Sequence, residues 1–190
     1  MTYSAWGLAL LFFTLSVQAA DYSGRDRWYL GVDAERGVGD ENLVANQSLN
    51  ARYVRAKLGG VGAQGIRFEF SWSRFVDPEA DWRISGFDGD LWLPYQVGRP
   101  HPRVRPYLLL GMGYHRYYGR ESAFLETNRA DNGAQGLNAG LAIVANLDRY
   151  TELTTTFRYR YLQWNVANDD SIPAADASLT SVAVGIQRLF

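Results

Sequence analysis

Cysteine is absent from this 190-residue sequence. A chain without thiols has no disulfide framework and no thiolate metal site. Long apolar runs are missing as well: after residue 20 no segment approaches the roughly 18 consecutive apolar residues that a membrane-spanning helix needs. We therefore expect neither a disulfide-stapled fold nor a transmembrane helix in the mature protein.

The sequence also lacks an excess of charge of either sign. Its 19 Lys and Arg residues against 20 Asp and Glu residues give a formal net charge of −1. This balance excludes a general attraction to nucleic acid or to anionic lipid. Histidine occurs only twice, and we interpret the adjacent acids Asp169 and Asp170 as a solvated loop tip rather than a metal site. No cofactor is expected.

The N-terminus carries an apolar segment from Ala5 to Val17, followed by the small-residue exit Gln18-Ala19-Ala20. This segment is too short to cross about 30 Å of hydrocarbon as a helix. Its length and its exit are typical of a secretory signal peptide. We predict a signal peptide over residues 1–19 and one exported domain over residues 20–190.

Alternation of apolar and polar residues predicts eight β-strands in that domain. The clearest run places Phe68, Phe70 and Trp72 on one face, and Arg67, Glu69 and other polar residues on the opposite face. Helical periodicity explains none of the runs. The predicted strands cover about residues 27–36, 50–59, 63–75, 82–97, 104–118, 135–146, 150–164 and 179–190.

The connections between these strands alternate in length. The long ones span residues 37–49, 76–81, 119–134 and 165–178, and the short ones span 60–62, 98–103 and 147–149. Long loops at one rim and short turns at the other are typical of membrane barrels, in which the short turns are periplasmic. An even number of strands then places both termini on the periplasmic side.

The strand faces that we assign to the interior carry charges of both signs. They hold six acids, Asp33, Glu35, Glu69, Asp88, Asp90 and Glu152, and five bases, Arg55, Lys57, Arg67, Arg158 and Arg160. The opposite faces carry the bulky apolar side chains, which is the inverse of a soluble barrel and fits a barrel surrounded by lipid. Two interpretations stay open. One is a packed ionic plug, because eight strands leave room only for side chains. The other is a gated pore in which Arg158 and Arg160 exchange partners among Asp88, Asp90 and Glu69.

Aromatic residues gather near the predicted strand ends, where amphipathic rings favour the two membrane interfaces. We predict one girdle of Trp28, Tyr95, Tyr107, Tyr150 and Phe190, and a second of Trp72, Trp82, Tyr114 and Tyr161.

The final strand ends on Phe190, and every second residue before it is Arg188, Ile186, Val184 and Val182. An exported chain that ends in this way resembles the bacterial outer-membrane β-barrel family. In that family the terminal aromatic residue belongs to the signal read by the assembly machinery. The resemblance implies that Phe190, Ile186, Val184 and Val182 form this barrel-assembly signal.

Two internal segments are similar to strands of the small OmpA-like and OmpX-like barrels: Arg105 to Tyr114, with Pro-Tyr before Gly-x-Gly, and Phe157 to Tyr161. The resemblance implies an all-β, eight-stranded antiparallel up-and-down transmembrane barrel with periplasmic termini. It also implies a monomer in the outer membrane of a Gram-negative bacterium, in contact with membrane lipid, lipopolysaccharide and the assembly machinery.

We expect a non-enzymatic envelope or surface-binding scaffold that acts through its extracellular loops. The alternatives are a narrow solute pore and a lipid A-modifying enzyme. An enzyme would need a nucleophile beside a base. His101 lies in a predicted periplasmic turn, and His115 points inward two strands away from Ser71 and Ser73. The sequence therefore specifies no catalytic residue.

Overall fold

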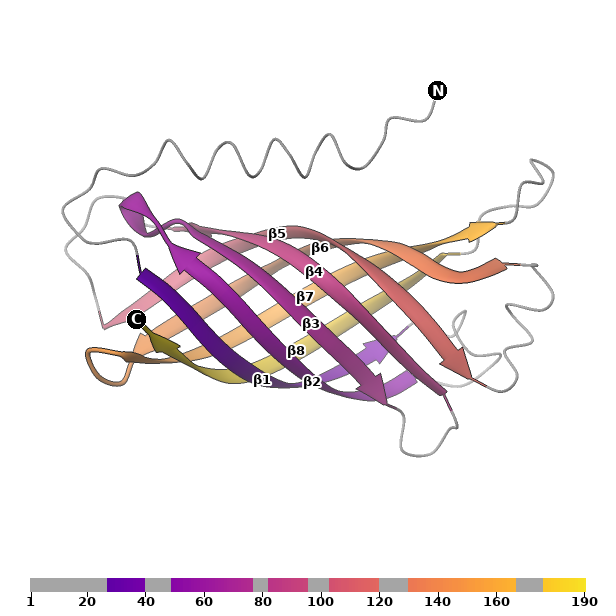
Figure 1. Ribbon diagram of the computed structural model, residues 1–190, viewed down its shortest axis with the longest axis horizontal. Coiled ribbons are helices and arrows are strands. Elements are labelled where there is room, and N and C mark those ends of the chain that lie inside the picture. The colour runs from indigo at the N-terminus through magenta and orange to yellow at the C-terminus, as the bar shows by residue number, and fades with distance from the viewer. Residues whose placement is uncertain (1–26, 40–48, 77–81, 96–102, 120–129, 167–175) are drawn as a thin grey trace, which may run out of the picture.

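The eight predicted strands close into a single barrel, with each strand antiparallel to its neighbours and β1 paired with β8 (Figure 1). The protein is seen here in a computed structural model, which describes residues 27–39, 49–76, 82–95, 103–119, 130–166 and 176–190. Within these ranges no helix is long and apolar enough to cross a membrane. The predicted fold, an eight-stranded antiparallel up-and-down barrel, is confirmed.

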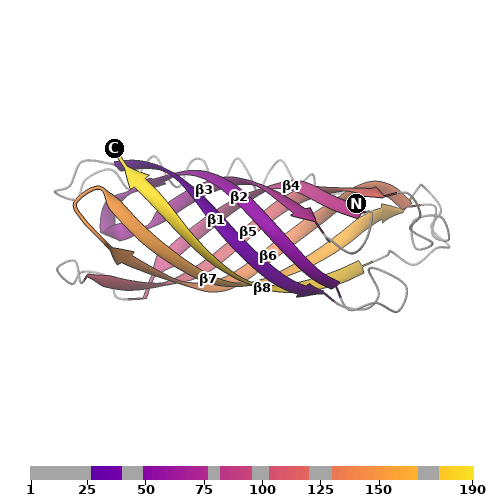
Figure 2. The ribbon, with the colours of Figure 1, turned by 90° about the horizontal axis from the view of Figure 1, so that it is seen from below.

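The strands run in sequence order around the barrel. Their bounds are β1 Arg27–Gly39, β2 Leu49–Val61, β3 Arg67–Val76, β4 Trp82–Pro94, β5 Val104–Gly119, β6 Ala130–Asn146, β7 Thr151–Val166 and β8 Asp176–Leu189. The short helix η2, Ala63–Gly65, the turn over residues 147–150 and the C-terminal Phe190 lie at one end, which we name the turn end (Figures 1 and 2). The opposite end, where β1 and β3 finish, is the loop end.

The starts of β3 and β6 differ most from the prediction. β3 begins at Arg67 rather than at residue 63, because the chain first makes a tight turn in which Gln64 (φ 61°) and Gly65 (φ 79°) are left-handed. β6 begins at Ala130 rather than at residue 135, with a register shift between Ala130 and Ala134. Backbone pairing with β7 extends this strand through small and polar residues, whose side chains carry no alternation signal.

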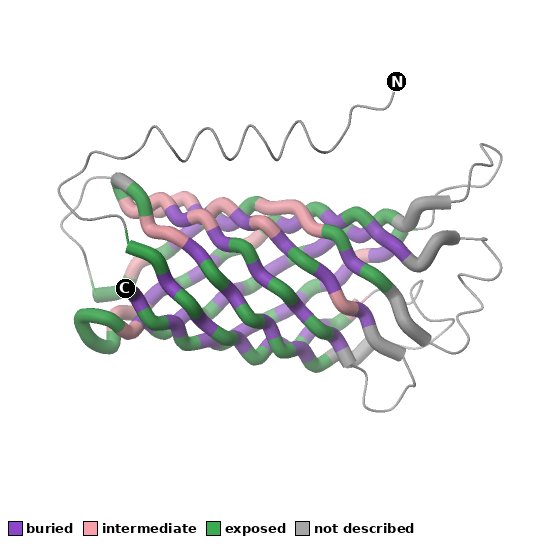
Figure 3. Tube along the Cα trace, viewed as in Figure 1, coloured by how far each residue is buried: buried purple, intermediate pink, exposed green. Residues whose placement is uncertain are grey.

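Burial alternates along most of the strands, as Figure 3 shows and as β1 and β8 show residue by residue. The outward positions are apolar: Leu30 is 57% exposed, Phe70 49% and Phe157 50%. A soluble protein would bury such side chains. The outer surface is therefore suited to lipid, and the polar side chains are left for the interior.

Several predicted features lie outside the described residues. These are the signal peptide, the turn that contains His101, most of the long connections, and the acids Asp169 and Asp170.

Candidate functional site: the charged interior

The structure places all eleven predicted interior charges inside the barrel, each at most 5% exposed. They sit at alternate positions of β1, β2, β3, β4 and β7, so the two-residue period of each strand directs them to one side. Small inward residues make room for them. A Cβ added at Gly185 would collide with the Asp33 carboxylate, and one added at Gly111 would collide with the carboxylate of Asp90.

Near the turn end, one ion pair crosses the lumen. Arg67 of β3 donates two hydrogen bonds to Glu152 of β7, at 2.7 and 2.9 Å, and these two strands lie on opposite sides of the barrel. Arg105 donates to the same carboxylate at 2.8 Å, and the Gln187 amide donates at 2.6 Å. The Glu152 carboxylate thus accepts hydrogen bonds from side chains of three other strands, β3, β5 and β8.

At mid-height, Asp33 of β1 joins two cations of β2. Arg55 donates to it from both Nε, at 2.7 Å, and Nη2, and Lys57 Nζ lies 2.7 Å from its other oxygen. Lys57 also donates to Thr154 Oγ1 on β7, at 2.9 Å. Glu69 accepts a hydrogen bond of 3.0 Å from the hydroxyl of Tyr29.

Toward the loop end, the two arginines of β7 share the acids of β4 and β1. Arg158 Nη2 lies 2.7 Å from Asp90, and Arg160 donates to Glu35 at 2.8 Å. Both guanidinium groups also face Asp88, at 3.8 and 3.6 Å. Of the three acids expected to partner these arginines, Asp88 and Asp90 lie beside them, whereas Glu69 lies 4.0 Å from Arg55 instead; Glu35 was not expected.

Two apolar layers lie within the charged interior, and sequence reasoning missed both. The layer toward the turn end is a cluster of buried Trp92, Tyr107, Leu109, Ala142 and Val144. The layer toward the loop end contains buried Tyr53, Phe75, Ile84, Leu162 and Leu179. Its Tyr53 and Phe75 rings meet edge to face, with centroids 3.9 Å apart. Register places Glu152 opposite Asn146, nearer to the turn end than Val144 of the first layer, so Glu152 lies on the turn-end side of this layer.

Tyr107 corrects the predicted girdle. It is 1% exposed and points inward, where its hydroxyl oxygen accepts a 3.1 Å hydrogen bond from Arg67 Nε. The reason is strand parity, because Tyr107 shares the face of inward Leu109. The other predicted girdle residues with described side chains are exposed: Trp28, Tyr95, Tyr150, Phe190, Trp72, Tyr114 and Tyr161. The side chain of Trp82 lies outside the described part.

One arrangement in the interior has the composition of a hydrolase triad. Gly86 is paired with Ser73 on one side and with His115 on the other, so these residues form a line across three strands. Gly86 has no side chain, and the His115 ring occupies the space where its Cβ would be. His115 Nε2 lies 3.2 Å from Asp88 Oδ1.

This line lacks two requirements of an acyl-transfer site. Ser73 Oγ and His115 Nδ1 have no hydrogen-bond partner, so the serine is not held against its base. Both side chains are at most 1% exposed, so a lipid substrate has no access to them. Among the described residues, no group of three or more His, Asp or Glu side chains is placed to hold a metal ion.

Comparison with known proteins identifies the architecture. No protein-family model matches the sequence, and the search among curated proteins finds no match. Among solved structures, the Neisserial surface protein NspA aligns with a TM-score of 0.63 at 15% identity, over 86% of this chain and 97% of NspA. The chain has the fold of the small eight-stranded outer-membrane β-barrels.

Two further outer-membrane barrels have the same fold. Ail, the attachment invasion locus protein of Yersinia pestis, aligns with a TM-score of 0.54 at 14% identity, over 88% of this chain and all of Ail. The outer-membrane enzyme PagL aligns with a TM-score of 0.51 at 9% identity, over 82% of this chain and 97% of PagL. One architecture thus carries both a surface protein and an enzyme, so the fold leaves the activity open.

Proposed function

We propose that the protein is a non-enzymatic barrel of the bacterial outer membrane that presents its long connections as a structural or binding surface. The packed interior carries this proposal. Buried ion pairs join strands on opposite sides of the lumen, and two layers of buried apolar side chains pack beside them. Such an interior holds the strands in place and leaves the exposed ends for recognition.

The orientation that we propose has the turn end, with Phe190, in the periplasm and the loop end outside. Membrane barrels place their short turns toward the periplasm. The described turns support this assignment, since residues 147–150 close one hairpin and Ala63–Gly65 another. Ail shows that this fold can hold a ligand, because one of its structures contains the heparin analogue sucrose octasulfate.

The absence of cysteine provides a direct test of orientation. A single cysteine can be placed at Ser122, within the long connection after β5, or at Asp148, in the short turn before β7. On intact cells a membrane-impermeant maleimide should label Ser122→Cys and leave Asp148→Cys unlabelled until the outer membrane is opened. The reverse pattern would overturn the orientation.

The two alternatives require separate measurements. The pore predicts steady ion conductance in planar bilayers, whereas the packed interior predicts none above the bilayer background. The enzyme predicts a change in lipid A mass when the protein is expressed. We expect an unchanged lipid A spectrum, because the Ser73–His115 line is buried. Conductance or a shifted spectrum would replace the scaffold proposal.

A further inference from the structure

His115 occupies a niche inside the barrel that glycines of three strands provide. A Cβ added at Gly86 of β4, Gly113 of β5 or Gly136 of β6 would lie 3.4 Å or less from the imidazole ring. Phe75 of β3 packs against the ring edge to face, with centroids 5.8 Å apart. Because His115 is only 1% exposed, a charge on its ring must be balanced by groups of the interior rather than by water.

Asp88 of β4 is the acid that faces the ring. Its Oδ1 lies 3.2 Å from His115 Nε2 and accepts a 2.8 Å hydrogen bond from Asn138 of β6. Its Oδ2 lies 3.8 Å from Arg158 and 3.6 Å from Arg160, both on β7. His115 is thus joined to a set of ion pairs that we name the loop-side group: Glu35, Asp88, Asp90, Arg158 and Arg160.

On its other side the ring faces β3, where Ser73 and Phe75 are uncharged. Ser73 is paired with Gly86, and His115 Nδ1 lies over Gly86. Neither Ser73 Oγ nor His115 Nδ1 has a hydrogen-bond partner. A proton on Nδ1 would supply a donor on the side where Ser73 carries an acceptor oxygen.

The loop-side group has one acid more than it has arginines. It holds three acids and two arginines, and each of these side chains is at most 1% exposed. The other two ion-pair groups of the described interior have no excess of acid. Their members are Asp33, Glu69, Arg55 and Lys57 in one, and Glu152, Arg67 and Arg105 in the other. Because an uncompensated buried charge is costly, the loop-side group needs one further positive charge.

We propose that His115 binds a proton in the folded barrel and balances the loop-side group as an imidazolium. A proton on one of the three acids would neutralise the same group, but it would take a charged partner away from an arginine. A proton on His115 instead turns the contact with Asp88 into a charge-assisted hydrogen bond.

This proton makes the stability of the barrel depend on pH. A histidine in an unfolded chain releases its proton near about pH 6.5. Below that pH both states hold the proton, and the contribution of His115 to stability is fully present. Above it the folded barrel binds one proton more than the unfolded chain, so stability falls as the pH rises, until the folded state releases the proton as well.

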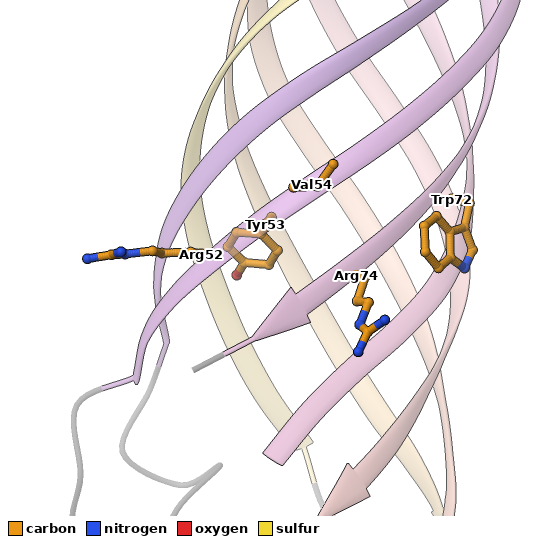
Figure 4. Close-up of a pocket in the computed structure, with 5 residues that line it drawn as sticks. All are labelled: Arg52, Tyr53, Val54, Trp72 and Arg74. Carbon is orange, nitrogen blue, oxygen red and sulfur yellow. The ribbon is translucent and has the colours of Figure 1, made fainter. Parts of the chain in front are cut away.

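The charge of His115 is also linked to the apolar layer toward the loop end. The Phe75 ring contacts both the His115 ring and the guanidinium group of Arg160, whose carbon lies 5.5 Å from the Phe75 centroid. Tyr53 packs on the same ring. On the outer surface of β2 and β3, Tyr53 also helps to line a pocket of about 310 Å³, together with Arg52, Val54, Trp72 and Arg74 (Figure 4). Loss of the proton would therefore change the contacts of this layer as well as the ion pairs.

The two histidines of the sequence allow a direct measurement of this charge. His101→Gln leaves His115 as the single imidazole, so nitrogen NMR of isotope-labelled histidine in the folded full chain, in detergent micelles, reports on His115 alone. At about one pH unit above the ordinary value for histidine, we expect both ring nitrogens to carry a proton. A neutral ring at that pH would overturn the proposal.

Asp90→Asn, made in the same background, tests the charge count. It removes one acid of the loop-side group and keeps the pair of His115 with Asp88, so the group balances without an added proton. The pH midpoint of the His115 titration should fall by at least about one unit, which is a tenfold loss of proton affinity. The matched control is Asp148→Asn, which removes an exposed acid in the turn and should leave the midpoint unchanged. Equal midpoints with and without Asp90→Asn would place the balancing proton elsewhere and overturn the proposal.

Urea unfolding in phospholipid vesicles over the same pH range measures the effect on stability. In His101→Gln the unfolding equilibrium constant should rise with pH above about pH 6.5, by at most about tenfold per unit. His115→Gln should lose this dependence, and an unchanged slope would overturn the link to stability. Should His115→Gln not fold, the same comparison is made with Asp90→Asn, which should flatten the slope, whereas Asp148→Asn should keep it.

Discussion

Glu152→Gln is the sharpest test of the packed interior. The carboxylate of Glu152 accepts hydrogen bonds from Arg67, Arg105 and Gln187, which come from three other strands. The substitution keeps the shape of the side chain and removes its charge. A Gln side chain also replaces one acceptor oxygen by an NH₂ donor, which would face the donors of its neighbours.

The expected loss follows from the burial of the partners. The Arg67 side chain is 1% exposed, whereas that of Arg105 is 16% exposed. Arg105 can recover solvation from water at the turn end, but Arg67 would be left as a buried charge without its acid. Removing one partner of a buried pair costs about 3–5 kcal/mol. We expect Glu152→Gln to fall near the lower limit, at about 3 kcal/mol, because the amide oxygen still accepts one bond.

Urea unfolding of the folded barrel in phospholipid vesicles, followed by tryptophan fluorescence, measures this loss. Thr155→Val is the matched control, since Thr155 is an exposed outward residue of the same strand and should change stability by less than about 0.5 kcal/mol. Arg67→Gln completes a double-mutant cycle and should cost less than Glu152→Gln, because Glu152 retains Arg105 and Gln187. If Glu152→Gln unfolds like the control, the interior is water-filled and the packed plug is refuted.

Gly185→Ala should unfold at a lower urea concentration than wild type, because the Asp33 carboxylate already fills the space of the added Cβ. The control Gly89→Ala has no atom within 4 Å of its added Cβ and should unfold like wild type. Equal urea midpoints for the two variants would contradict the packing. Deleting Phe190 should lower the amount of assembled barrel in isolated outer membranes, measured from the difference in gel mobility between unheated and boiled samples. Refolding of the same variant in detergent should change little. Normal assembly in cells would argue against a recognition role for Phe190. In the turn, the backbone N–H of Tyr150 lowers the pKa of Asp148, and hydrogen bonds from the side chain and the backbone N–H of Thr151 add to this effect. Because this pKa is lowered in the folded state, the contribution of Asp148 to stability is fully present above its ordinary value of 3.8 and is lost as the pH falls through the lower folded-state pKa. Asp148→Ala should therefore lower the melting temperature at neutral pH by an amount that shrinks in acid.

The two-residue period explains why so much of the fold could be predicted from the sequence. A strand that alternates Phe68 and Phe70 with Arg67 and Glu69 has only one way to face lipid, and a shift by one residue would invert every side chain. The same rule predicts that Tyr107 points inward, because it lies an even number of residues from inward Leu109 and His115. The preference of aromatic residues for strand ends predicts an outward Tyr107, but strand parity determines its direction, and its side chain is buried in the interior.

The partners inside the barrel could not be predicted in this way. Parity places Arg67 and Glu152 in the lumen, but it does not say that they meet across it, since β3 and β7 share no backbone pairing. That contact depends on how the tilted strands are staggered around the closed sheet. Stagger is set by the whole set of registers, including the shift between Ala130 and Ala134, where the sequence carries no alternation.

The line from Ser73 through Gly86 to His115 shows how closely a plug and a reactive site are related in such a barrel. Sequence reasoning separated the serine from the histidine by two strands, and the glycine between them removes that barrier. What separates this line from catalysis is access: Phe75 packs against the His115 ring with centroids 5.8 Å apart, in the apolar layer toward the loop end. If the barrel is the scaffold that we propose, the same packed interior that holds its strands together would therefore also keep Ser73 and His115 away from a substrate.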